Sequence, residues 1–218
     1  MTKTILSIFI AFTFLACRQH NAIETSKFDR LSAFYKDTIF TEMFLFPDTS
    51  SNDSLYVFRG NQIDSVTFNI LAESVTQGLP WTEGFYGIYS FKINNKYIGL
   101  LTRTPGEYSS SKISLWIYNT IKDSIVNNLQ LANIYGDAGD FETINSYLYF
   151  NNQKTLKALT YRHYIYDHSV EEESDTIIEE NRNYYLTKIG DNSIDTLSTD
   201  SSKLHRQFQN QLIRMIGY

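Results

Sequence analysis

The clearest signal for a fold in this sequence is the stretch FYGIYSFKINNKYIGLLTRT, residues 85–104. Its two halves, 85–93 and 96–104, are rich in aromatic and aliphatic residues of the kinds that favour β-strands. Between them stand Asn94 and Asn95, which both tolerate the positive φ that a tight hairpin turn needs. We therefore predict an antiparallel hairpin here.

The same pattern continues on both sides of this hairpin. From Ile39 onward, short apolar runs alternate with Asn, Asp, Gly and Ser, which favour turns. Two more strand pairs are predicted, 112–118 with 124–131 and 144–150 with 155–166. The chain is therefore expected to be mainly β, an antiparallel meander that is sandwich-like or open barrel-like.

A helix is predicted at each end of this β region. Ser26, with Asp29 three residues later, has the spacing of a helix N-cap and favours a short N-terminal helix. Residues 202–216 have helical periodicity and predict an amphipathic C-terminal helix that packs on the sheet. A helix on a membrane surface is the alternative. The apolar face of the 202–216 segment is formed by Leu204, Phe208, Leu212, Met215 and Ile216.

The first sixteen residues have the order of a secretory signal. Lys3 precedes an apolar run at 5–15, and the small residue Ala16 follows. A run of about eleven residues is too short to span a bilayer as a helix, which needs about twenty. We expect a signal peptide at 1–16, a polar tether at 17–25 and a single β-rich domain at 26–218.

The residues Phe14-Leu15-Ala16-Cys17 resemble the lipobox of bacterial lipoproteins, in which the cysteine thiol carries lipid. They depart from the usual pattern because Phe14 stands where Leu is common. The resemblance implies lipidation of Cys17, palmitate among its acyl chains and attachment to the membrane of the cell envelope. Arg18 is not the Asp associated with inner-membrane retention, which favours the outer membrane. An ordinary secreted protein with a cysteine near the cleavage site is the alternative.

Charge and cysteine content narrow the classes of partner. Removal of residues 1–16 takes away Lys3 and no acidic residue, so 18 basic residues remain against 24 acidic ones, a formal charge of −6. Nucleic acid is a poor partner for such a chain.

Cys17 is the only cysteine, so an internal disulfide framework is excluded. No lipase-type serine elbow, zinc-protease helix motif or phosphate-binding loop occurs.

Four aromatic residues form the first candidate binding face. In the predicted strands, Trp116 and Tyr118 alternate with aliphatic residues, as do Tyr147 and Tyr149. If the strands lie close together, four rings share one surface, which suits a protein interface or a sugar platform. The alternative is that a second sheet or the C-terminal helix covers these rings.

An acidic loop at 136–142 is the second candidate. Asp137, Asp140 and Glu142 offer carboxylate oxygens in a loop that also contains Gly136 and Gly139, a combination that can bind Ca²⁺. The alternative is an acidic turn that holds no ion, and no other cofactor is expected. A hydrolase would need two of these carboxyl groups to line a cleft about 5 to 9.5 Å apart.

The expected function follows from the lipid anchor and the lack of catalytic motifs. We expect a lipid-anchored cell-envelope protein that binds a protein partner without catalysis. The alternatives are a glycan-binding lipoprotein that uses the aromatic face and an envelope hydrolase that uses the loop at 137–142.

Overall fold

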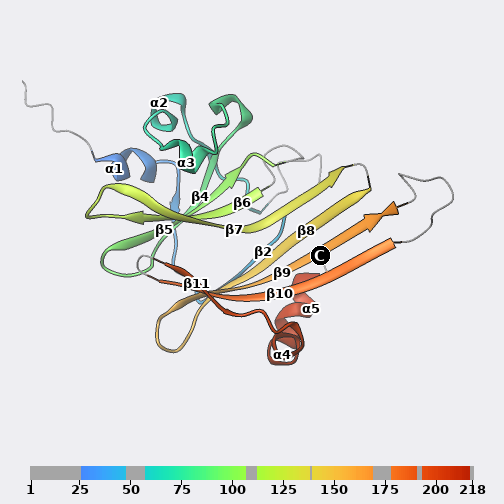
Figure 1. The fold of residues 1–218 in the computed structure, drawn as a ribbon. Helices are drawn as coiled ribbons and strands as arrows, with labels where there is room; N and C mark the ends of the chain where they lie inside the picture. Colours follow the sequence, from blue (N-terminus) through green and yellow to red (C-terminus); the bar gives the residue numbers. More distant parts are fainter. Residues whose placement is uncertain are drawn as a thin grey trace, which may run out of the picture.

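A computed structural model describes residues 26–47, 57–106, 112–137, 139–168, 178–190 and 193–216. The predicted signal peptide and tether, with Cys17, lie outside these ranges. The prediction of a mainly β fold with a helix at each end is confirmed (Figure 1). The strands are β1 (Lys36–Asp37), β2 (Glu42–Leu45), β3 (Asn61–Gln62), β4 (Tyr86–Lys92), β5 (Tyr97–Thr104), β6 (Lys112–Asn119), β7 (Ser124–Asp137), β8 (Asp140–Phe150), β9 (Leu156–Asp167), β10 (Ile178–Ile189) and β11 (Ile194–Ser198). The helices are α1 (Lys27–Ser32), α2 (Ser65–Phe68), α3 (Glu73–Thr76), α4 (Ser201–Gln207) and α5 (Gln209–Ile216), with a 3₁₀ turn at Trp81–Glu83.

The strands from β4 to β11 form an antiparallel meander in which each strand pairs with the next along the chain. The short strands β1 and β3 both pair with β4, β1 in parallel and β3 antiparallel. The three predicted hairpins correspond to β4–β5, β6–β7 and β8–β9. The sheet ends at β11 and does not close on itself in the described part of the chain.

Strand β7 turns the meander into two layers. Its first part pairs with β6 from Ser124 to Ala132, and its second part pairs with β8 from Asn133 to Asp137. Where β7 leaves β8, the strand β2 takes its place and pairs with residues 146–149. One layer therefore contains β4, β5 and β6, and the other contains β2 and β8 to β11, as the sandwich-like prediction requires.

The central core lies between these two layers. It combines inward-facing aliphatic side chains of β5 and β6 with those of β8 and β9, which alternate along each strand with side chains of the opposite face. Helices cover part of the outer face of each layer, α1 to α3 on the first and α4 with α5 on the second (Figure 1). Central members of the core are Leu101, Ile113, Leu115, Ile117, Leu148, Leu156 and Ala158.

The turn between β4 and β5 differs from the prediction. Neither Asn94 nor Asn95 has a positive φ. Instead, the Asn94 side-chain oxygen accepts hydrogen bonds from the backbone N–H groups of Lys96 and Tyr97, at 2.8 and 3.1 Å. The turn is therefore stabilised by hydrogen bonds to the Asn94 side chain and does not need a residue with positive φ.

The N-terminal helix is confirmed, but two further helices are not foreseen by the sequence pattern. In α1, the Ser26 hydroxyl accepts a hydrogen bond from the N–H of Asp29 at 3.1 Å, as the sequence spacing indicated. Asp64, followed by Ser and Val, suits a turn before a strand, but it caps α2 by accepting from the N–H of Thr67. A turn and a cap use the same carboxylate bond, so the sequence signal is ambiguous.

The C-terminal helix is two short helices, α4 and α5, that meet at Phe208. The chain bends there because Phe208 has a φ of −120°, outside the helical range. Leu204, Phe208, Leu212 and Met215 are buried as predicted. Ile216 is not, because it is 47% exposed at the end of α5.

Candidate functional site

The four predicted aromatic residues do not form one open surface. Trp116 and Tyr118 are each 1% exposed and lie under the α1–α3 helices, where Trp116 packs near Phe85 and Tyr118 contacts Phe28. The alternation along β6 was correctly interpreted, but both faces of this strand are buried. When aromatic residues occupy the outer face, the alternation of residues in the sequence does not distinguish a strand that is buried on both faces from a strand that is buried on one.

Tyr147 and Tyr149 belong to a separate cluster under α4 and α5. Their rings stack with centroids 4.9 Å apart, and Tyr149 also contacts Phe208. The Tyr147 hydroxyl donates to Glu42 at 2.7 Å, and burial together with this bond raises the pKa of Tyr147 to about 12. Helices thus cover these rings, which was the alternative considered from the sequence, so the open aromatic platform for a sugar or a protein is corrected.

The acidic loop lies at the tip of the β7–β8 hairpin, where Asp137 and Asp140 are opposite one another. The Asp140 carboxylate accepts a hydrogen bond from Tyr164, and Glu142 forms an ion pair with Arg162. In the described ranges, no three His, Cys, Asp or Glu side chains are placed to hold a metal ion. Asp140 and Glu142 are thus engaged by neighbouring side chains of β9, and the described residues give no support to a Ca²⁺ site in this loop.

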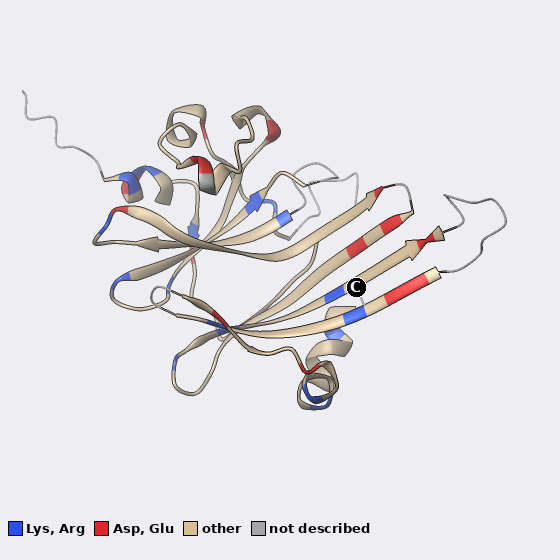
Figure 2. Ribbon diagram, in the orientation of Figure 1, with Lys and Arg blue, Asp and Glu red and all other residues tan. Residues whose placement is uncertain are grey.

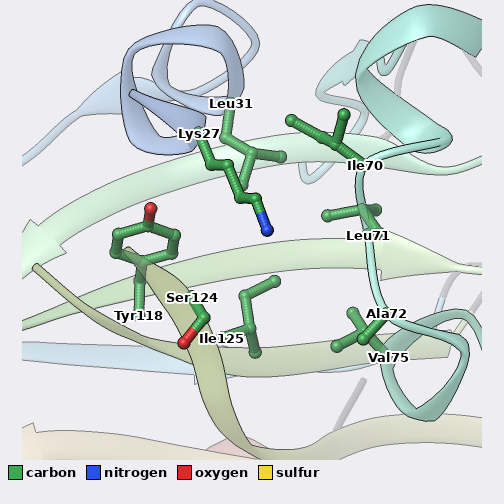
Figure 3. A pocket seen from close by; sticks show the side chains of 9 residues that line it. All are labelled: Lys27, Leu31, Ile70, Leu71, Ala72, Val75, Tyr118, Ser124 and Ile125. Carbon is green, nitrogen blue, oxygen red and sulfur yellow. The ribbon is translucent and has the colours of Figure 1, made fainter. Parts of the chain in front are cut away.

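A pocket of about 210 Å³ opens between α1, β7 and the α2–α3 connection (Figure 3). Its walls are mainly apolar, with Leu31, Leu71 and Ile125 among them, and the Lys27 ammonium points into the space. Beside it, Asp123 accepts hydrogen bonds from the Tyr118 hydroxyl and the Lys27 N–H, and both bonds lower the pKa of Asp123. The pocket is smaller than the roughly 300–1,000 Å³ of typical ligand sites.

Parts of four neighbouring strands form a projection, here called the arm. It comprises residues 133–137, 140–144, 162–167 and 178–183 of β7 to β10, none of which is buried. The arm extends beyond both groups of helices (Figure 1). Figure 2 shows acidic residues at its tip, with basic residues further back along β9 and β10.

The outer edge of β10 is open along the arm. Strand β9 pairs with β10 over its whole length, but β11 pairs with it only from Leu186 to Ile189. In the described part of the chain, no strand pairs with the outer edge of β10 from Ile178 to Tyr185. All side chains from Ile178 to Asn183 are exposed. None of the sequence motifs considered above marks this edge, although the exposed run Glu-Glu-Asn-Arg-Asn is an unusual composition for a strand.

The direction of the backbone groups along this edge is set by one hydrogen bond. The N–H of Tyr184 donates to the hydroxyl of Ser201, the first residue of α4, at 3.2 Å. That N–H therefore points away from β9. Backbone groups of residues two apart point the same way in a strand, so the N–H and C=O groups of Arg182, Glu180 and Ile178 also point outward.

The side chains on this edge form a small charged network. Glu180 accepts hydrogen bonds from Arg182 at 2.6 and 2.9 Å and lies 2.6 Å from Nε2 of His163. The bonds from Arg182, and then from His163, lower the pKa of Glu180. The Glu180 and Arg182 side chains are 42% and 59% exposed, so both remain accessible to a partner.

Comparisons of the chain with protein-family models, with curated protein sequences and with solved structures gave no match. A helix capable of spanning a membrane is absent from the described ranges.

Proposed function

We propose that this chain is a lipid-anchored protein of the bacterial cell envelope that binds a protein partner without catalysis, through strand addition at the outer edge of β10. The open edge of the arm is the observation that carries the binding part of the proposal. Cys17 and the residues before it support the anchor, and Arg18 favours the outer membrane.

An exposed strand edge presents backbone donors and acceptors that an extended segment can satisfy. Proteins usually shorten, cover or pair such edges, because an open edge invites association with other chains. On β10 the outward groups of Ile178, Glu180 and Arg182 lie on a part of the sheet that projects clear of the helices (Figure 1). Main-chain hydrogen bonds would supply affinity in this mode, and side chains along the edge would supply specificity.

The charges of the edge restrict which segment can pair. Unselective pairing is disfavoured because a strand without compensating charges would desolvate Glu179, Glu180 and Arg182. A segment with opposite charges in register would be accepted. The edge is therefore expected to bind a specific partner and not exposed strands in general.

The test is site-specific photocrosslinking of the natively anchored protein in its own envelope. A photoreactive residue at position 181 should crosslink to protein, whereas the same residue at Asn152, in the β8–β9 turn, should not. Arg182→Pro removes one outward N–H and should abolish the crosslink. Arg182→Ala, which loses the same side chain but keeps the N–H, should retain more of it. No crosslink at position 181, or one that Arg182→Pro leaves unchanged, would contradict the proposal.

The anchor has its own test. Cys17→Ala should block lipid attachment, so the protein should become extractable from membranes without detergent. A Cys17→Ala protein that stays as firmly attached as the parent would remove the lipoprotein part of the proposal.

A further inference from the structure

We infer that the segment added at this edge is β10 of a second copy, paired antiparallel about Asn181; this inference rests on the proposed function. Glu180 and Arg182 flank Asn181 on the open edge. Antiparallel pairing about Asn181 places Glu180 of each copy opposite Arg182 of the other. The sequence of the edge is thus complementary in charge to itself.

Other ways of pairing two copies lack this complementarity. Pairing about Glu180 places that carboxylate opposite its own counterpart, and pairing about Arg182 does the same with two guanidinium groups. Parallel pairing in register also sets like charges side by side. Like charges directly opposite one another destabilise a strand pair, whereas opposite charges stabilise it. Charge therefore selects one register.

The backbone supports the same register. The N–H and C=O groups of Glu180 and Arg182 point outward, so each of these residues can exchange two hydrogen bonds with the facing residue of the other copy. The two Asn181 residues then form the non-hydrogen-bonded pair on the twofold axis. Tyr184 marks the end of the pairing, because its N–H is already bound to Ser201. The contact is isologous and closed, as a twofold dimer requires.

The side chains already lie where this pairing needs them. Glu180 and Arg182 are two residues apart and share one face of the arm, where they pair within one copy. In the dimer each guanidinium would lie between the carboxylate of its own strand and that of the facing strand. His163 contacts Glu180 from the β9 side and leaves the outer edge free for the second copy.

A contact of about five residues per strand is short, so anchoring matters. Two copies held in one membrane meet at a higher effective concentration than two copies free in solution. We therefore expect the dimer in the native envelope and a concentration-dependent monomer–dimer equilibrium after extraction.

Cysteine crosslinking tests the register directly in the full, natively anchored chain. In a non-hydrogen-bonded antiparallel pair the facing Cα atoms are about 4.5 Å apart, within the range of about 4.4–6.8 Å that a disulfide spans. Asn181→Cys should therefore give a disulfide dimer under mild oxidation. Asn183→Cys is the matched control, because in this register the two substituted residues would be four residues apart along the strands, about 13 Å. The parent chain reports any dimer that forms through Cys17.

Charge reversal tests the partner. In the Asn181→Cys background, Glu180→Arg places a positive charge of each copy opposite Arg182 of the other copy. This repulsion should reduce the disulfide dimer at least tenfold. Adding Arg182→Glu restores opposite charges in the same register and should recover the dimer. An Asn181→Cys dimer that is insensitive to Glu180→Arg, or an Asn183→Cys dimer of equal yield, overturns the inferred register.

The two proposals fail in different ways. Photocrosslinking of position 181 to a protein of another mass, without a disulfide dimer of the Asn181→Cys variant, overturns self-pairing and leaves the protein-binding proposal in place. Absence of every crosslink at position 181 overturns both.

Discussion

Replacing Trp116 with alanine should reduce stability and should not act through a binding surface. The side chain is 1% exposed between β6 and the α1–α3 helices. A buried aromatic side chain removes about 150–250 Å² from water, which at about 25 cal/mol/Å² is about 4–6 kcal/mol. Alanine keeps a small part of this, and measured Trp→Ala changes in cores cost about 3–5 kcal/mol.

The assay is thermal unfolding of the mature protein, followed by circular dichroism. For a protein of this size, each kcal/mol lowers Tm by about 2–4 °C, so Trp116→Ala should lower it by roughly 6–20 °C. Ile121→Ala is the control, since Ile121 is 72% exposed in the β6–β7 turn and should change stability by at most about 0.5 kcal/mol. A Trp116→Ala protein that keeps its Tm but loses its partner would contradict the core assignment and return Trp116 to the surface.

Three other predictions concern local features. Gly99→Ala should destabilise the fold by about 1–3 kcal/mol in urea unfolding, because its Cβ would lie 2.5 Å from the Phe91 ring; Phe91→Leu should relieve part of this cost, and a strictly additive pair would exclude the clash. The lowered pKa of Asp123 means that its charge stabilises the fold above about pH 3.9, its unfolded value, and that this contribution is lost as the pH falls through the lower folded pKa. Asp123→Asn, which tolerates the observed φ of 49°, should therefore be less stable than the parent at pH 7 and approach it in acid, and a constant difference across this range would rule out the linkage. Asp200→Ala removes the α4 cap, a 2.9 Å bond to the N–H of Lys203, and should cost about 1 kcal/mol in the same urea assay; Ser202→Ala keeps the cap and should not.

The strands were predictable because their residues carry local information. The runs at 85–104, 112–118 and 144–150 combine β-forming residues with turn residues, and the structure forms the hairpins that they predict. The small helices α2 and α3 were not predictable in the same way. Each spans four residues, too few to show helical periodicity.

The candidate site was harder to predict, because exposure depends on tertiary contacts. The alternation around Trp116 indicates a two-faced strand, but only the positions of α1 to α3 reveal that its outer face is covered. In the same way, the open edge of β10 depends on where β11 stops pairing, at Leu186. Sequence patterns report which side chains share a face, and they do not report which backbone edge lacks a neighbour.

The double pairing of β7 couples the unfolding of the two layers. Because one continuous strand is hydrogen-bonded to β6 in the first layer and to β8 in the second, neither layer can lose its order without disturbing the other. Local openings with low free energy should be confined to the arm, where no residue is buried, and the rest should unfold in one cooperative transition. In the monomer, amide hydrogen exchange should accordingly be fast for the outward N–H groups of Glu180 and Arg182, and pairing with a second copy should slow it. It should be slow and uniform across the central part of β7, on both sides of the point where it passes from one layer to the other.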